Sequence, residues 1–227
     1  MDKKILARFA FREAVSVISV GVALFWSAGR IDWWAGWGLV ALDCSWIVGT
    51  ITVIFRRDPD LLAERLTPRK GSKRWDMVIL SLHSLLQVAT FVIAGLDQRY
   101  GWTPGLPVMA QIVAFILCLM GYAFAVWATA SNPFFTYIVR IQPDRDHVVA
   151  TGGPYRYIRH PSYAGGTLVI ILVPLLLASW PAFVIASADA LLIVLRTSME
   201  DRTLQAELPG YADYARQVRY RLVPGIW

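Results

Sequence analysis

The residues best suited to catalysis or ligand binding lie near the end of the chain. Arg196 and Glu200 are four positions apart, so on a helix their side chains share one face. Spacing alone favours an ordinary ion pair, which is common and individually weak. Their position beside a histidine-bearing loop favours another use, because a guanidinium and a carboxylate can separately hold the two charges of a zwitterionic small molecule.

That loop is a polar stretch of about 30 residues, 131–162, which holds His147 and His160. Long ordered loops are usually functional. The Gly152-Gly153 pair permits a tight turn, and Pro161 disfavours helix at the residue before it, so the next helix should begin close by. The two histidines could also ligate a metal, but no Cys or HExxH spacing supplies further ligands.

Long apolar runs flank these polar residues. Hydrophobic residues make up 56% of the chain and charged residues 17%, a composition typical of a membrane protein. A transmembrane helix needs roughly 20 apolar residues. The final run, 163–195, is too long for one span and is broken by Ser179-Trp180-Pro181, a predicted turn. The other four runs are 14–28, 33–55, 77–96 and 106–130.

These runs predict an all-α, polytopic membrane protein with about six transmembrane helices, the last two forming a helical hairpin. Of the 22 basic residues, only Arg30 and Arg99 fall in the predicted outer loops, and cytoplasmic loops collect Lys and Arg. Both termini are therefore expected in the cytosol. The first run could be a cleavable signal peptide, but the even number of spans satisfies the charge rule only if it stays.

The basic residues also bear on partners. The formal charge of +6 is distributed between apolar runs, so it does not form the basic face of a nucleic-acid-binding domain. The segment 56–76 begins with a predicted helix cap at Asp58-Pro59 and places Leu61, Leu62 and Leu66 on one side. We expect it to lie along the membrane surface as an inner amphipathic loop that contacts lipid headgroups.

The order and spacing of the motifs resemble the isoprenylcysteine carboxyl methyltransferase family. The resemblance covers roughly the last 90 residues, and it also extends to the 58–76 segment of bacterial-type members. The motifs that carry it are His147 six residues before Gly153-Pro154-Tyr155, then Arg159-His160-Pro161-x-Tyr163, a helical hairpin, Arg196-x-x-x-Glu200-Asp201, and Pro209-Gly210-Tyr211-x-x-Tyr214.

The resemblance implies a multi-pass enzyme, expected in a bacterial inner membrane, with a cytosolic C-terminal pocket for S-adenosylmethionine. Residues 1–130 would form the N-terminal transmembrane helices and 131–227 the methyltransferase core. Arg196 would orient the acceptor, and Glu200 would act both in catalysis and in cofactor binding. The other implied cofactor-binding residues are His147, Val148, Val149, Ala150, Tyr155, His160, Pro161, Ser162 and Tyr163.

The implied acceptor is a lipophilic small molecule or a lipid-anchored group, such as an isoprenylcysteine-type carboxylate, that enters from the bilayer. Two alternatives remain at this point. The ending Val218–Gly225 also resembles membrane sterol reductases, which use NADPH. A non-enzymatic membrane scaffold or a transporter is the other, although the chain lacks paired repeats of the kind many transporters show.

Overall fold

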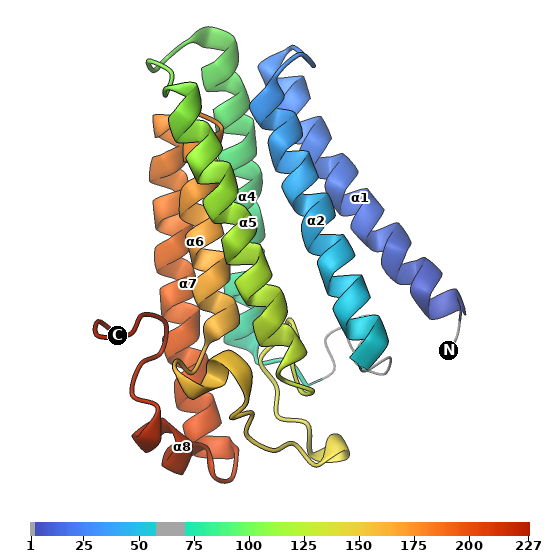
Figure 1. The fold of residues 1–227 in the computed structure, drawn as a ribbon, viewed down its shortest axis with the longest axis vertical. Coiled ribbons are helices and arrows are strands. Elements are labelled where there is room, and N and C mark those ends of the chain that lie inside the picture. The colour runs from blue at the N-terminus through green and yellow to red at the C-terminus, as the bar shows by residue number, and fades with distance from the viewer. Residues whose placement is uncertain (1–2, 58–70) are drawn as a thin grey trace.

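The chain is folded as a bundle of long helices. The computed structural model describes residues 3–57 and 71–227, and the regular elements of these residues are α-helices and two short 3-10 turns (Figure 1). In chain order they are α1 (Lys3–Ala28), α2 (Trp34–Arg57), α4 (Arg74–Tyr100), α5 (Val108–Ala130), η1 (Pro143–Arg145), η2 (Gly153–Arg156), α6 (Pro161–Leu176), α7 (Trp180–Glu207) and α8 (Tyr211–Gln217).

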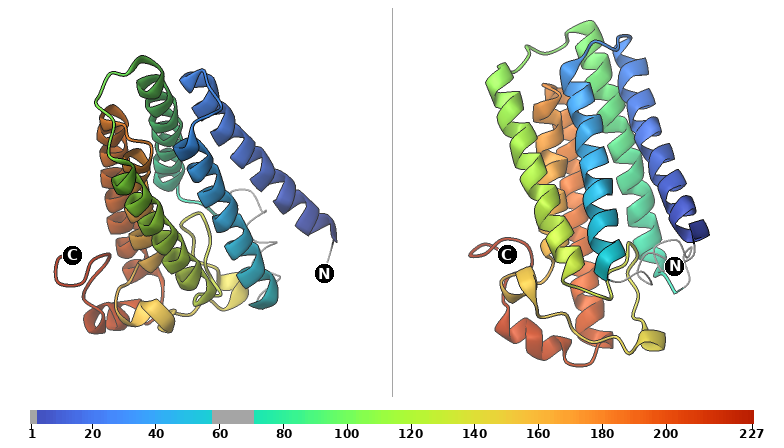
Figure 2. Two further views of the ribbon diagram at one scale, coloured as in Figure 1. Left: turned by 45° about the horizontal axis from the view of Figure 1, so that its top comes forward. Right: turned by 45° about the vertical axis from the view of Figure 1, so that its right-hand side comes forward.

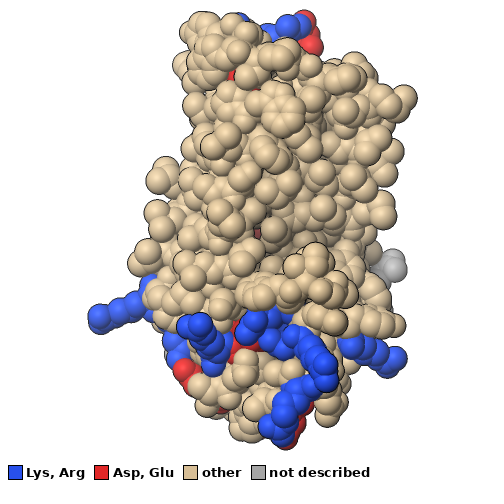
Figure 3. Space-filling model, turned by 90° about the vertical axis from the view of Figure 1, so that its left-hand side faces the viewer, with Lys and Arg blue, Asp and Glu red and all other residues tan. Residues whose placement is uncertain are grey.

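Five of the helices, α1, α2, α4, α5 and α7, are long and apolar enough to cross a membrane. Figure 3 shows the corresponding belt of uncharged surface, with Lys and Arg gathered mainly at one end. The protein is therefore a multi-pass membrane protein, as predicted. The apolar helix α6 has 16 residues, about 24 Å of helix against a hydrocarbon core of about 30 Å, so a sixth full span stays a prediction.

The helices α6 and α7 form the predicted hairpin. Ser179 is the N-cap of α7 and its hydroxyl accepts a hydrogen bond from the N–H of Ala182, while Pro181 suits the first turn. The apolar run ends at Leu195, and α7 continues past it to Glu207. Proline next occurs at Pro209, so the helix carries Arg196 and Glu200 beyond the apolar run.

Small residues let the helices approach closely. A Cβ atom at Gly165 of α6 would lie 2.5 Å from the carbonyl oxygen of Gly121 in α5, and one at Gly95 of α4 would lie 2.7 Å from the carbonyl oxygen of Leu24 in α1. Close packing of this kind is a main source of helix association in lipid. As Figure 2 shows, α1 and α2 lie on one side of the bundle and α6 and α7 on the other.

The polar parts of the chain gather at one end of the bundle. The 131–160 loop between α5 and α6, the end of α7 and α8 all lie there, and both termini lie toward the same end (Figure 1). Lys73, just before α4, reaches this layer, since its Nζ lies 2.6 Å from Oε1 of Glu207. Most of the predicted amphipathic segment 56–76 lies outside the described residues.

Candidate functional site

A pocket opens in this polar layer, and we call it the loop pocket. Its walls come from the 131–160 loop, the start of α6, the end of α7 and α8, and its volume is about 80 Å³. The 131–160 loop and the end of α7 thus meet in one pocket. The predicted site residues that line it are His147, Val149, Ala150, Tyr155, His160, Ser162, Tyr163 and Glu200.

Three predicted site residues do not line the loop pocket: Val148, Pro161 and Arg196. Val148 is 62% exposed. Pro161 is buried at the first position of α6, where its ring starts the helix. Arg196 lies behind the pocket wall, with its guanidinium carbon 5.0 Å from the centroid of the Tyr163 ring.

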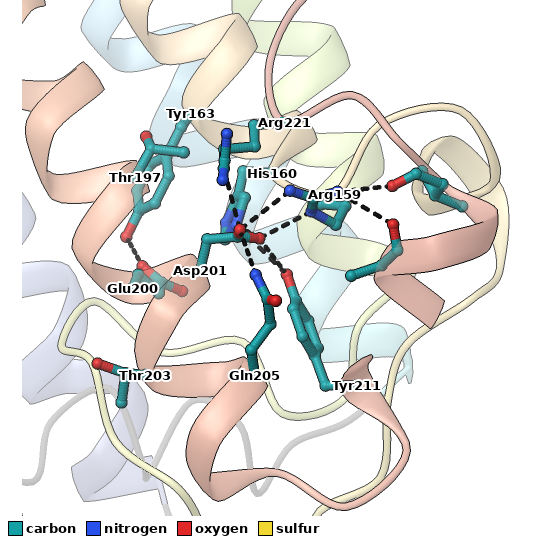
Figure 4. Close-up of polar contacts among 12 residues, drawn as sticks. Arg159, His160, Tyr163, Thr197, Glu200, Asp201, Thr203, Gln205, Tyr211 and Arg221 are labelled. Carbon is teal, nitrogen blue, oxygen red and sulfur yellow. Dashed lines mark hydrogen bonds and ion pairs between the residues drawn. The ribbon is translucent and has the colours of Figure 1, made fainter. Parts of the chain in front are cut away.

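The centre of the polar layer is the carboxylate of Asp201, which is fully buried. Arg159 binds it through two nitrogens, with Nε 2.7 Å from Oδ1 and Nη2 3.0 Å from Oδ2. The other groups around it are the His160 ring at 3.2 Å, the Tyr211 hydroxyl at 3.0 Å, the Gln205 amide at 2.8 Å and Nε of Arg221 at 2.9 Å (Figure 4).

The same cluster fixes the C-terminal segment against the pocket. The backbone N–H groups of Arg159 and His160 donate to the carbonyls of Tyr220 and Arg221, each at 2.9 Å. Nη1 of Arg159 also donates to the carbonyl of Val218 at 2.8 Å. Since a buried charge is tolerated when it is paired and hydrogen-bonded, Asp201 serves as the anchor that joins α7, α8, the start of α6 and the chain end.

Glu200, the neighbour of Asp201, points into the loop pocket instead. Its Oε2 accepts a hydrogen bond from the Tyr163 hydroxyl at 2.5 Å, and the Tyr163 ring stacks on the His160 ring with centroids 5.8 Å apart (Figure 4). Tyr155 lies in the same wall, and its carbonyl accepts from the Tyr214 hydroxyl at 2.7 Å. A carboxylate among aromatic rings is therefore the main charged feature of this wall.

His147 lies on the opposite, loop side of the pocket. Its ring stacks on Phe134 with centroids 4.5 Å apart. Burial and the nearby cations of Arg145 and Arg140 lower its pKa below the ordinary histidine value, so the ring is neutral at pH 7. Its Nδ1 accepts a hydrogen bond from the backbone N–H of Gln142 at 3.4 Å, so the neutral ring has its Nε2–H left as a donor for a ligand.

The expected ion pair between Arg196 and Glu200 is not the pairing that the structure shows. Nε of Arg196 lies 2.8 Å from Oδ1 of Asp76, and Nη2 donates to the carbonyl of Tyr137 at 2.7 Å. Glu200 turns to Tyr163 instead. Asp76 comes from the first turn of α4, 120 positions earlier in the chain, so spacing along one helix could not reveal it.

The sequence motifs include Asp201, in Arg196-x-x-x-Glu200-Asp201, but Asp76 was not predicted as a functional candidate. Both are fully buried and accept hydrogen bonds from arginine. For Asp201 the sequence did hold a signal, because it follows Glu200 directly in the Arg196-x-x-x-Glu200-Asp201 motif. For Asp76 the signal is weaker, since acidic residues are common in the first turn of any helix.

Comparison with known proteins identifies relatives for most of the chain. The model of the isoprenylcysteine carboxyl methyltransferase (ICMT) family matches residues 113–206. A protein-S-isoprenylcysteine O-methyltransferase from Dictyostelium discoideum is 28% identical over 181 residues, which is 74% of this chain and 68% of that protein. One from Tribolium castaneum is 31% identical over 116 residues, covering 47% of this chain and 39% of that protein.

The fold has a counterpart among solved structures. The structure of the eukaryotic intramembrane Ras methyltransferase ICMT superimposes with a TM-score of 0.57 and 17% identity, covering 94% of this chain and 75% of that one. Lengths differ, and the match spans about two fifths of the Tribolium protein. The matched family region runs from α5 through α7, so it includes most residues of the loop pocket.

Proposed function

Because this chain belongs to the isoprenylcysteine carboxyl methyltransferase family, we propose that it is an integral-membrane enzyme that transfers a methyl group from S-adenosylmethionine to a lipophilic acceptor. The observation that carries the proposal is the loop pocket, in which the 131–160 loop and the end of α7 bring Glu200 and His160 together at one end of the membrane bundle. The acceptor class is an isoprenylcysteine-type carboxylate or a related lipid-anchored or small lipophilic group.

The residues of the loop pocket suit this cofactor. The stacked rings of Phe134 and His147 can take a planar adenine. The Glu200 carboxylate is an acceptor for an ammonium group. The pocket of about 80 Å³ is smaller than the roughly 300 Å³ at the low end of ligand sites, so its walls must move apart when the cofactor enters.

The main task of the protein in this reaction is to align the acceptor with the methyl group. When bound, S-adenosylmethionine supplies a methyl group already activated by its sulfonium centre. The protein must hold the acceptor nucleophile behind that methyl group and exclude water. In this proposal Glu200 holds the cofactor, and Arg196 orients a carboxylate acceptor from the membrane side of Tyr163, held in place by Asp76. A carboxylate acceptor needs no general base.

We also propose that the end of the bundle with the loop pocket and both termini faces the cytosol of a bacterium, the protein being in the inner membrane. The basic residues support this orientation, since Lys and Arg concentrate at that end (Figure 3) and cytoplasmic segments carry such an excess. The acceptor would then enter laterally from the inner leaflet, and membrane lipids would surround the apolar belt.

Binding of S-adenosylhomocysteine to the purified protein in detergent tests the proposal by calorimetry. We expect binding by the wild type, and at least a tenfold loss in Glu200→Gln, about 1.4 kcal/mol. Glu207→Gln is the matched control, since Glu207 lies on the same helix but is exposed and bonded to Lys73. A folded wild type that binds NADP and not S-adenosylhomocysteine would overturn the proposal in favour of a reductase.

The acceptor can be identified separately. Membranes that contain the protein are incubated with methyl-labelled cofactor, and the lipids are extracted and separated. A labelled lipid or lipid-anchored product that disappears with Glu200→Gln and persists with Glu207→Gln is the expected result. Label found only in water-soluble material would contradict entry of the acceptor from the bilayer.

A further inference from the structure

A second and larger cavity lies inside the membrane-spanning part of the bundle, and we call it the span cavity. Its volume is about 560 Å³, within the range of roughly 300–1,000 Å³ typical of small-molecule sites. Residues from α1, α2, α4, α5, α6 and α7 line it, and it shares no lining residue with the loop pocket. It is therefore a second cavity, distinct in its lining from the loop pocket.

The walls of the span cavity carry carboxylates, which a purely hydrocarbon ligand would not need. Glu13 of α1, Asp43 of α2 and Asp189 of α7 all line it, together with one arginine, Arg12 of α1. Charged groups at membrane depth are costly unless they are paired or line a polar cavity. Two of the three are paired, Glu13 with Arg12 at 2.5 Å and Asp189 with Nδ1 of His83 at 2.7 Å.

Asp43 is the exception among these carboxylates. Among the described residues, the hydrogen bond to its side chain comes from the Tyr122 hydroxyl, at 3.2 Å. A carboxylate has about four acceptor positions, so most of the hydrogen bonds that Asp43 could accept are still available to a ligand in the cavity. Gln87 of α4 also lines the cavity, and within 3–57 and 71–227 its amide makes no hydrogen bond.

The rest of the lining is apolar. Val20, Leu39, Phe91, Val169 and Val173 contribute walls from four helices. The cavity thus combines an acidic, incompletely bonded patch with hydrocarbon surface long enough for part of an alkyl chain. A ligand that complements both must carry a hydrogen-bonding cation on an apolar body, whereas an anionic ligand would be repelled by the acidic patch.

We propose that the span cavity binds a lipophilic amine, with the protonated amino group held by Asp43 and Gln87 and the apolar chain against the valine and leucine walls. The ammonium supplies the donors that Asp43 lacks, and a charge-assisted hydrogen bond is the stronger kind. The proposal concerns binding alone and does not depend on methyl transfer. Two sources share this chemistry: a free long-chain amine and the headgroup of an aminophospholipid.

Trp46 provides a local signal for the test, because it lines the span cavity and its ring centroid lies 5.2 Å from that of Tyr122. The probe is a long-chain alkylamine brominated near its amino end, with the brominated alcohol of the same chain as the neutral control. Bromine quenches tryptophan fluorescence at contact. Comparing wild type with Trp46→Phe isolates the signal of this site from the chain's other tryptophans.

We expect the amine to quench Trp46 at a concentration about tenfold lower than the alcohol does, and Asp43→Asn to reduce this preference to about onefold. Gln87→Leu, which removes no hydrogen bond of the described structure, should reduce it about threefold and guards against a folding defect in Asp43→Asn. Equal quenching by amine and alcohol in the wild type, or a preference for the amine that is unchanged in Trp46→Phe, would overturn the proposal.

Lipid composition separates the two sources. In nanodiscs of phosphatidylcholine alone the amine probe should quench Trp46. If added phosphatidylethanolamine displaces the probe from the wild type, the natural ligand is a lipid headgroup, and if it does not, the ligand is a free amine. Binding of S-adenosylhomocysteine, measured on the same samples, shows independently whether the loop pocket is intact.

Discussion

Nε of Arg196 on α7 lies 2.8 Å from Oδ1 of Asp76, a fully buried carboxylate in the first turn of α4. The other oxygen of Asp76 accepts from the N–H of Val139 at 2.7 Å, and Arg196 also donates to the carbonyl of Tyr137. One ion pair therefore connects two membrane helices with the 131–160 loop. It also places Arg196 between the two cavities, since Tyr137 lines the span cavity and Tyr163 the loop pocket.

Asp76→Asn should lower the turnover number for methyl transfer by about tenfold, equivalent to about 1.4 kcal/mol, because Arg196 loses the charge that holds it. The affinity for S-adenosylhomocysteine should change little, since neither residue lines the loop pocket. Kinetics with labelled cofactor and calorimetry measure the two effects. Asp32→Asn is the control, as Asp32 is exposed and pairs with Arg30 near the other end of the bundle.

The result that would contradict a positioning role for Asp76 is specific. If Asp76→Asn weakens cofactor binding and leaves the turnover number unchanged, the ion pair supports the pocket wall and does not orient Arg196. A general loss of folding would appear as a lower melting temperature in detergent, so that measurement accompanies the kinetics.

Asp201→Asn should destabilise the fold more than any exposed substitution. Arg159, His160, Gln205, Tyr211 and Arg221 all direct polar groups at this carboxylate. Removing one member of a buried charge pair costs about 3–5 kcal/mol, and the amide of asparagine brings donors where the neighbours already donate.

Thermal melting followed by circular dichroism should show this loss for Asp201→Asn, together with weaker binding of S-adenosylhomocysteine. Asp213→Asn provides the comparison, because Asp213 is exposed and its ion pair with Arg216 lies at the surface, where such pairs contribute little. Equal melting temperatures for the two variants would mean that Asp201 does not anchor the chain end.

The helices could be predicted from the sequence because their causes are local. Runs of apolar residues set the spans, Ser179 and Pro181 set the turn of the hairpin, and Gly153, with its φ of +56°, allows the tight turn before Tyr155. Hydrophobicity marks where α7 leaves the membrane, whereas the helix itself continues to Glu207.

The partners of the polar residues could not be predicted in the same way. Asp201 accepts hydrogen bonds from residues between positions 159 and 221, and Arg196 forms an ion pair with a residue of α4. Each pairing depends on how helices rotate about their axes when they pack, which no single helix determines. The helical spacing of Arg196 and Glu200 was read correctly, but Asp76 and Tyr163 draw the two side chains apart.

His147 should make the stability of the protein depend on pH. Its pKa is lowered in the folded state, mainly by burial and then by Arg145 and Arg140. The unfolded chain therefore binds a proton at a higher pH than the folded chain does, so stability falls as the pH drops below about 6.5 and is constant above it for this group. His147→Gln should reduce the fall in melting temperature between about pH 7.5 and 5.5.

The other titrating groups are the same in both proteins, so the difference between wild type and His147→Gln isolates this histidine. If acidification lowers the melting temperature of both proteins by the same amount, the 131–160 loop does not bury His147 strongly enough to exclude the proton.

Two adjacent glycines of α6 offer a test of the helix packing that supports both cavities. A Cβ atom at Gly165 would lie 2.5 Å from the carbonyl oxygen of Gly121 and 3.2 Å from the Ala125 side chain, whereas one at Gly166 would meet nothing within 4 Å. Gly165→Ala should therefore force α5 and α6 apart and cost about 1–3 kcal/mol. Gly166→Ala should be neutral or slightly stabilising, because alanine favours the helix by about 1 kcal/mol relative to glycine. Melting temperatures in detergent measure both, and a Gly165→Ala protein as stable as Gly166→Ala would show that these two helices are not in close contact in the membrane protein.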